Sequence, residues 1–217
     1  MVQSIIISLF DFTGNMVEPW AKAGFLCYCV DVRHPAGESR EGNIIRVGVD
    51  VREWLPPYAA VAMLFAFPPC TDVTASGARW FRDKGLGGLV EALQLFDATV
   101  RLAEWTGAPY LIENPVSTVS TYWRTPDYMF NPCDYGGYLH PPGDAYTKRT
   151  CLWTGNGFVM PKVKRVAPFE GSKMHRLSPS AHRASLRSAT PKGFAQAVFE
   201  ASAFQCFQEL PKAEVAG

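Results

Sequence analysis

The sequence predicts an open α/β domain with a doubly wound, mostly parallel sheet, and three observations support this fold class. Short apolar runs recur along the chain, and stretches with helical spacing separate them. Runs of this length are typical of parallel strands that are buried on both faces. Polar residues follow directly after several runs, which places them at the carboxyl edge of the sheet, where such folds bind ligands.

The predicted elements alternate between strand and helix. We expect strands over five short apolar runs, at residues 3–10, 26–32, 43–51, 60–67 and 108–115. Helices are expected over 16–25 and 86–107, where apolar residues recur at helical spacing. The turn-like stretch DFTGN joins the first strand to the first helix.

The composition is that of a globular protein with a sizeable core. Of the 217 residues, 47% are hydrophobic and 19% charged, and the formal net charge is +1, so the overall charge does not indicate a polyanionic partner. No apolar run reaches the ~20 residues that span a bilayer, and residues 3–10 are interpreted as a strand rather than a signal peptide. We therefore expect a cytoplasmic protein with no membrane partner.

Six scattered cysteines predict reduced thiols rather than disulfides. Cys133, His140 and Cys151 lack a C-x-x-C pair and a fourth ligand, so we expect no metal site. Cys70 stands behind two prolines at the end of an apolar run, in AFPPCT (66–71). It is either a small core residue or a nucleophile held in position.

Six segments, in order along the chain, resemble the motifs of DNA cytosine-5 methyltransferases. They are SLFDFTGNMVEPWAKAGF (8–25), VGVDVREW (47–54), AFPPCTDVTASG (66–77), IENPV (112–116), YTKRTCLWTG (146–155) and RSATPKGFAQAVFEA (187–201). The pattern is most similar to the short members found in phages and prophages. The resemblance implies a Rossmann-like S-adenosylmethionine-dependent methyltransferase fold, cytosine in DNA as the substrate, and a bacterial or phage-infected host cell.

The resemblance implies a catalytic trio of Cys70, Glu113 and Arg149. Cys70 would add to carbon 6 of a cytosine taken out of its stack, which makes carbon 5 nucleophilic. Glu113 would contact N3 and the exocyclic amine and share a proton there, and Arg149 would orient O2. Asn114 would hold the loop.

The resemblance also implies a binding site for S-adenosylmethionine. Its residues would be Phe10, Thr13, Gly14, Asp31, Asp50 and Pro68. Asp31 would accept hydrogen bonds from the ribose hydroxyls, and Asp50 from the adenine amine. Thr13 and Gly14 would let the backbone approach the methionine, and Pro68 would help to fix the Cys70 loop.

Several positions depart from the family pattern. Phe12 and Asn15 replace glycines, Thr71 replaces glutamine, Cys151 replaces the second arginine of its motif, and Ser188 replaces asparagine. None of these changes removes a group that the chemistry needs. Together they leave room for a weakened enzyme.

The chain is expected to comprise three regions. Residues 1–155 would form the catalytic and cofactor-binding core, 156–186 a short basic segment in place of a target-recognition domain, and 187–217 a helix that returns to the core. We expect DNA contacts from Thr74, Lys162, Lys164, Arg165 and Arg176. Such contacts are salt-sensitive and largely sequence-blind, although a basic run is often only a solvated face. A partner protein supplying recognition, through the aromatic stretch 127–146, is an alternative.

Other functions fit the sequence less well. An amino-group methyltransferase needs an acceptor before the paired prolines and an aromatic residue after them, but Phe67 and Cys70 stand there. Methylation of free nucleotides or RNA would explain the missing recognition domain but not the basic segment. A catalytically weak or inactive module that binds DNA or a partner fits the departures, but not the joint presence of Cys70, Glu113 and Arg149.

Overall fold

The computed structural model describes residues 4–74, 81–172 and 189–208. The described strands form one eight-stranded mixed sheet with the order β3-β4-β2-β1-β5-β6-β8-β7. The strands are β1 (Ile5–Leu9), β2 (Leu26–Val30), β3 (Gly37–Glu41), β4 (Ile44–Gly48), β5 (Val61–Ala66), β6 (Tyr110–Pro115), β7 (Tyr128–Phe130) and β8 (Thr150–Gly155).

The centre of the sheet is parallel. β1 pairs with β2 and β5, β2 with β4, and β5 with β6, all in parallel, whereas β3, β8 and β7 add antiparallel partners at the two sides. The chain proceeds from β1 to one side and then returns to the other, so the strand order reverses at β1. This is the position at which open α/β sheets bind ligands. The predicted α/β class with a mostly parallel sheet is confirmed, and the topology is compatible with a Rossmann-like fold.

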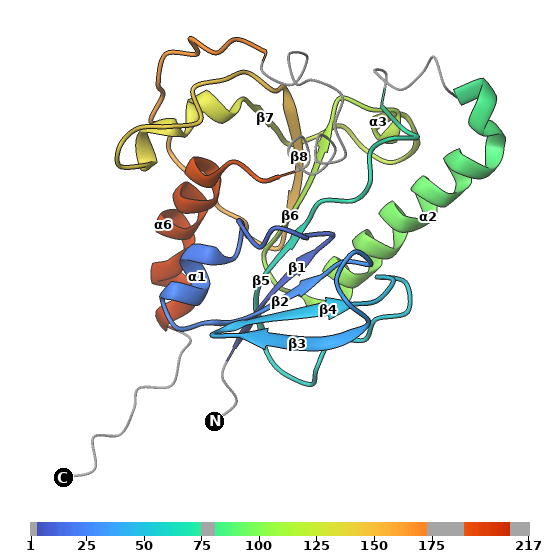
Figure 1. Cartoon of the computed structure of the whole chain (residues 1–217), viewed down its shortest axis with the longest axis horizontal. Coiled ribbons are helices and arrows are strands. Elements are labelled where there is room, and N and C mark those ends of the chain that lie inside the picture. The colour runs from blue at the N-terminus through green and yellow to red at the C-terminus, as the bar shows by residue number, and fades with distance from the viewer. Residues whose placement is uncertain (1–3, 75–80, 173–188, 209–217) are drawn as a thin grey trace.

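Helices cover both faces of the sheet (Figure 1). α1 (Glu18–Lys22) and α6 (Lys192–Gln208) pack against each other on one face, and α2 (Phe81–Thr106) lies on the opposite face. Short helical turns follow β6: α3 (Val119–Tyr122), η2 (Pro132–Asp134) and η3 (Gly136–Tyr138). Among the described residues, no helix is long and apolar enough to cross a membrane.

Each face of the sheet has its own hydrophobic core. Under α1 and α6, the fully buried Trp20 packs edge-on against Phe25 and Phe199, with ring centroids 5.4 and 5.2 Å away. Under α2, Phe96 packs edge-on against Trp153 at 5.7 Å. Both faces of the central strands are therefore buried, which explains their continuous apolar sequences.

The predicted strands and helices are all present, although their bounds differ. The helix expected over 16–25 is only the five residues of α1, and the chain leaves it through Gly24 at φ 98°. The helix expected over 86–107 begins earlier, at Phe81, and is interrupted at Gly85 (φ 64°). Glycine adopts this left-handed conformation without the steric cost that other residues bear, so both positions mark changes of direction.

Three strands were not predicted. β3 is exposed along its whole length and consists mainly of polar residues, so it carries no apolar signal. β7 lies within the aromatic stretch 127–146, for which no strand was expected, and β8 lies within the segment that was identified only by its resemblance. β8 pairs antiparallel with β6 from Tyr110–Gly155 to Pro115–Thr150, and this pairing brings residues just before β8 to the carboxyl edge.

Replacement of Trp20 tests the packing of α1 and α6 on the sheet. Trp20→Ala should lower the free energy of unfolding by about 3–5 kcal/mol, the usual cost of emptying a large aromatic site in a core. The matched control is Trp105→Ala on α2, because that side chain is 70% exposed and its loss should change stability by no more than about 0.5 kcal/mol. Urea unfolding of both variants measures the difference, and equal effects would contradict this description of the core.

Candidate active site

The carboxyl ends of the parallel strands bring the candidate residues to one edge. The sheet register pairs Leu9 with both Val30 and Ala66, and Ala66 with Ile112. The residues that follow these partners are Phe10, Asp31, Phe67 and Glu113. Four features therefore lie in one row at this edge: the end of β1, the acid after β2, the loop that carries Cys70 and the acid of β6.

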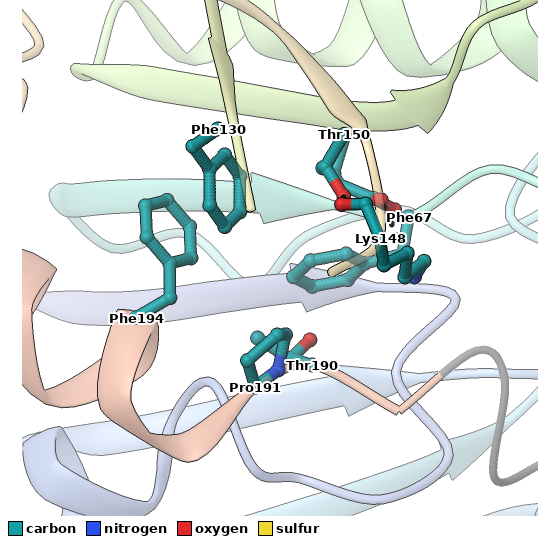
Figure 2. A pocket seen from close by; sticks show the side chains of 8 residues that line it. Phe67, Phe130, Lys148, Thr150, Thr190, Pro191 and Phe194 are labelled. Carbon is teal, nitrogen blue, oxygen red and sulfur yellow. Dashed lines mark hydrogen bonds and ion pairs between the residues drawn. The ribbon is translucent and has the colours of Figure 1, made fainter. Parts of the chain in front are cut away.

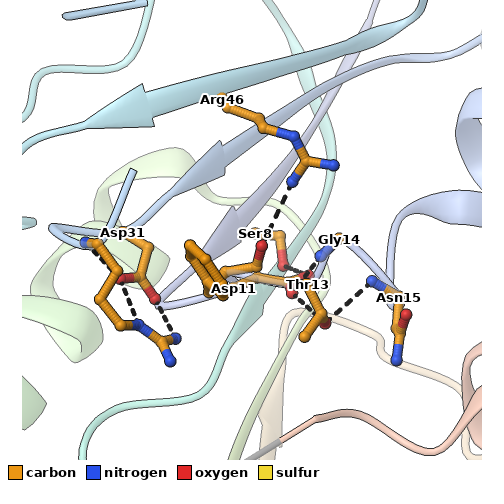
Figure 3. A network of polar contacts seen from close by, with 9 residues as sticks. Ser8, Asp11, Thr13, Gly14, Asn15, Asp31 and Arg46 are labelled. Carbon is orange, nitrogen blue, oxygen red and sulfur yellow. Dashed lines mark hydrogen bonds and ion pairs between the residues drawn. The ribbon is translucent and has the colours of Figure 1, made fainter. Parts of the chain in front are cut away.

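A buried carboxylate organises the turn after β1 (Figure 3). Ser8 Oγ donates to Asp11 Oδ2 at 2.9 Å, while Thr13 Oγ1 and the Gly14 N–H donate to Oδ1 at 3.1 and 2.7 Å. Burial raises the pKa of Asp11, and these hydrogen bonds oppose that effect. Sequence reasoning missed Asp11, although a turn opened by aspartate, with threonine two residues on, is the usual signal for such a network.

The backbone of the same turn is unusual. Phe10 has a φ of 57°, a left-handed conformation that is rare for a bulky residue and occurs mainly where the surroundings enforce it. Gly14 has a φ of 72°, and a Cβ there would only make ordinary contacts of 3.7–3.8 Å with Arg46 and Cys29. Conformation rather than close approach therefore favours glycine. Its N–H is already bound by Asp11.

Asp31 and Asp50 close two similar turns, each with the sequence Asp-Val-Arg. Arg33 Nη2 lies 2.6 Å from Asp31 Oδ2, and Arg52 Nη2 lies 2.6 Å from Asp50 Oδ2. In both turns the arginine backbone N–H donates to the same carboxylate. Hydrogen bonds from Arg52 lower the pKa of Asp50, and Arg52 also pairs with Glu91 on α2. Both carboxylates lie where the sequence predicts them, but each is engaged by its own arginine.

His34 adds a polar group that sequence reasoning missed. Its ring stacks on Phe12 with centroids 5.2 Å apart, and the Arg33 guanidinium lies 4.7 Å from the centroid of the same Phe12 ring. Burial lowers the pKa of His34. Its Nε2 is buried and has no hydrogen-bond partner among the described residues, which is unusual for a polar atom in a folded protein.

The Cys70 loop is fastened to the two strands that flank β5. The Phe67 N–H donates to the Leu9 carbonyl at 3.1 Å, and Asn114 Nδ2 donates to the Pro68 carbonyl at 2.9 Å. The Cys70 carbonyl accepts from the backbone N–H of Val73 and Thr74. Cys70 itself is half-buried. Asn114 therefore holds the loop as expected, and Pro68 is fixed through its carbonyl.

Next to this loop lies a small pocket of about 240 Å³, counting the part open to solvent (Figure 2). It is lined by Phe67, Glu113, Phe130, Lys148, Thr150, Thr190, Pro191 and Phe194. Lys148 Nζ lies 3.6 Å from Glu113 Oε1, and the two side chains are only 16% and 13% exposed. The pocket thus combines aromatic walls with one buried ion pair.

Arg149 does not enter this pocket. Its exposed side chain reaches Met129, with Nη2 3.4 Å from Sδ. Its neighbours Lys148 and Thr150 both line the pocket. The structure therefore places Arg149 outside the pocket, and the cation beside Glu113 is Lys148.

Part of the predicted basic segment is fastened to the η2–η3 region. The Lys164 N–H donates to the Asp134 carbonyl, the Gly137 N–H to the Lys164 carbonyl, and Val166 N–H to the Cys133 carbonyl. This backbone ladder gives the segment a fixed course along η2 and η3. The backbone of Lys164 and Val166 is therefore tied to η2 and η3, while the side chains of 162–165 remain exposed.

The predicted DNA-binding residues have different environments. Arg165 Nη2 pairs with Asp134 at 2.8 Å, and Lys164 Nζ lies 3.9 Å from the Tyr138 ring centroid. Lys162 is exposed. Thr74 is only 4% exposed and bridges to Ser117, so it offers little surface to DNA. Arg176 lies outside the described residues.

Potential metal ligands do not gather in the described part of the chain. No group of three or more histidine, cysteine or acidic side chains there is placed to hold an ion. Cys133 and Cys151 are buried, and burial raises the pKa of both thiols. These thiols are therefore placed as core residues.

Comparison with known proteins gives no independent guide to this site. No protein-family model matches the chain, and no curated protein matches it. The function has to be argued from the residues at the carboxyl edge.

The raised pKa of Asp11 predicts a specific pH dependence. As the pH falls from 7 toward 4, the folded protein takes up a proton at Asp11 before the unfolded chain does. The unfolding free energy of the wild type should therefore rise relative to that of Asp11→Asn. Asp50→Asn is the control of opposite sign, because the pKa of Asp50 is lowered in the folded protein. On acidification the unfolding free energy of the wild type should therefore fall relative to that of this variant. Parallel urea-unfolding profiles across pH for all three proteins would refute both assignments.

Proposed function

We propose that this chain is an S-adenosylmethionine-dependent DNA cytosine-5 methyltransferase of low sequence specificity, with Cys70 as its nucleophile. One observation carries the proposal: Glu113 and Asn114 are neighbours on β6, and while Glu113 lines the pocket, Asn114 binds the Pro68 carbonyl of the Cys70 loop. The acid and the nucleophile's loop are thus attached to the same rigid strand, which is the arrangement that covalent catalysis requires.

The proposed function implies the following chemistry. The Cys70 thiolate forms a bond to carbon 6, and the electron pair of the C5–C6 double bond moves into the ring, where Glu113 shares a proton with N3. Carbon 5 becomes enamine-like and would take the methyl group from the sulfonium of S-adenosylmethionine, with S-adenosylhomocysteine as the leaving group. Loss of the carbon 5 proton then drives the Cys70 sulfur from carbon 6 and restores the double bond. The base has to leave its stack to reach Cys70.

The neighbouring polar residues suit S-adenosylmethionine, which supplies the methyl group when bound. Asp31 and Asp50 carry acceptors for hydroxyl and amine groups, and the unpartnered His34 Nε2 is a further polar atom nearby in sequence. A carboxylate has about four lone-pair positions. Arg33 makes three hydrogen bonds to Asp31, so about one acceptor remains there for the cofactor. Arg52 makes four to Asp50, so Asp50 would have to exchange one of them to bind the adenine amine.

The engaged carboxylates favour a second candidate function. Asp31 and Asp50 are already ion-paired, and Arg149 lies outside the pocket. A methyltransferase-fold protein that binds DNA or a partner without efficient catalysis fits these two facts. The two candidates differ in one measurable property, which is the formation of 5-methylcytosine.

Replacement of Cys70 separates the two candidates. The purified protein, incubated with DNA and S-adenosylmethionine, should form 5-methylcytosine, detected by mass spectrometry of the digested nucleosides. Cys70→Ala should lower the rate by at least about 10³-fold, the scale expected when a covalent catalyst is removed. Cys206→Ala is the matched control, because that buried thiol lies on α6 in the core under α1 and α6.

An equal rate for Cys70→Ala and the wild type would exclude the covalent mechanism. If no 5-methylcytosine forms on any duplex or single strand while DNA is still bound, the binding module becomes the better description.

DNA binding by the basic segment predicts a graded salt dependence. Lys162→Gln should reduce the slope of log Kd against log salt concentration by about one, because each phosphate contact contributes about 0.9. Arg101→Gln on α2 is the control, since Arg101 is also exposed but pairs with Asp97 on the same helix. Equal slopes for wild type and Lys162→Gln in fluorescence titrations would show that Lys162 is only a solvated charge.

A further inference from the structure

We propose that Lys148, rather than Arg149, is the cation that contacts O2 of the target cytosine. The inference rests on the proposed function and assigns the recognition of one edge of the substrate. It is carried by three observations: the position of Lys148 at the pocket, its distance from Glu113, and the absence of a hydrogen bond at the buried Glu113 oxygen.

Lys148 lies on the pocket side, just before β8 begins. Glu113 pairs with Leu152, and Pro115 with Thr150, in the antiparallel ladder of β6 and β8, so the residues before Thr150 lie near the end of β6. Figure 2 shows Lys148 beside Thr150 and Phe67 at the pocket. The side chain of Arg149 is exposed and reaches Met129 instead.

Lys148 and Glu113 are too far apart to form a hydrogen bond with each other. Lys148 Nζ and Glu113 Oε1 are 3.6 Å apart, beyond the range of an N–H···O hydrogen bond. Glu113 Oε1 is buried and has no hydrogen-bond partner among the described residues. A buried polar atom without a partner is costly, so a ligand that supplies a donor and an acceptor side by side would relieve this cost.

The hydrogen-bonding edge of cytosine has this pattern. Its exocyclic amine donates, and N3 and O2 accept, in one row. Glu113 can bind the amine and share a proton with N3, and the Lys148 ammonium can donate to O2. When Cys70 adds to carbon 6, negative charge develops across N3, C2 and O2, and a fixed ammonium beside that charge stabilises it. Uracil presents a donor at N3 and an acceptor in place of the amine, so it fits Glu113 less well.

The test compares two bases, of which only one carries an oxygen at the proposed contact. One oligonucleotide carries a single cytosine among thymines, and the other carries in its place a 2-aminopyridine base, which keeps the ring nitrogen and the amine but lacks O2. Affinities are measured by fluorescence anisotropy without cofactor, in the wild type, Lys148→Met, Lys148→Arg and Arg149→Met. Thermal unfolding of each variant confirms that it is folded.

The wild type should bind the cytosine oligonucleotide about tenfold more tightly than the analogue, which corresponds to one charge-assisted hydrogen bond. Lys148→Met should reduce that ratio to about one, while Lys148→Arg restores most of it and Arg149→Met leaves it unchanged. A purely structural role of Lys148 would lower both affinities and keep their ratio. Any of three results would overturn the proposal: an unchanged ratio in Lys148→Met, a ratio near one in the wild type, or loss of the ratio in Arg149→Met alone.

The same variants separate this inference from the proposed function. The binding ratio needs neither S-adenosylmethionine nor Cys70. A normal ratio without any 5-methylcytosine would reject the methyltransferase and keep the Lys148 contact. Formation of 5-methylcytosine with a ratio near one would reject the Lys148 contact and keep the methyltransferase.

Discussion

The hydrogen bond from Asn114 to the Pro68 carbonyl is the interaction on which the candidate site depends. It crosses from β6 to the loop after β5, so the segment that carries Cys70 cannot move independently of the strand that carries Glu113. The parallel register holds the other side, because the Phe67 N–H binds the Leu9 carbonyl at the end of β1. These two hydrogen bonds hold the proline-containing loop at the edge of the sheet. A nucleophile on this loop would need little further ordering before it reacts.

Charge at this edge is arranged in pairs rather than as single groups. Asp31 and Asp50 are held by arginines of their own turns, and Glu113 faces Lys148. Asp11 is the exception, because it is buried among hydroxyl and N–H donors and burial raises its pKa. The ion pairs hold Asp31 and Asp50 in a fixed orientation at a modest cost in desolvation. In the pocket, Lys148 and Glu113 are too far apart for a hydrogen bond, so Glu113 Oε1 can still accept one from a ligand. The two aspartates near β2 and β4 are therefore paired, whereas buried atoms of His34 after β2 and of Glu113 on β6 lack a hydrogen-bond partner among the described residues.

The parallel strands were predictable because burial on both faces demands uninterrupted apolar runs, and the edge residues follow directly from where those runs end. β3 was missed because an exposed edge strand carries no such run. The difference at Arg149 has another origin: Arg149 was assigned by its place in a family motif, whereas its side chain reaches Met129 and Lys148 lines the pocket. The role of Asp11 depends on burial and on Ser8, three residues away, which a motif comparison does not weigh. Local pattern thus predicts strands and strand ends, but not which neighbouring side chain faces inward.

The most direct test of the central claim is the mass of the protein after incubation with S-adenosylmethionine and DNA that contains 5-fluorocytosine. Fluorine at carbon 5 prevents the proton loss that releases the enzyme, so the covalent species should accumulate. The account predicts a denaturant-stable protein–DNA adduct that requires the cofactor and maps by peptide sequencing to Cys70. An adduct at another cysteine, or formation of methylated product without any adduct, would contradict it.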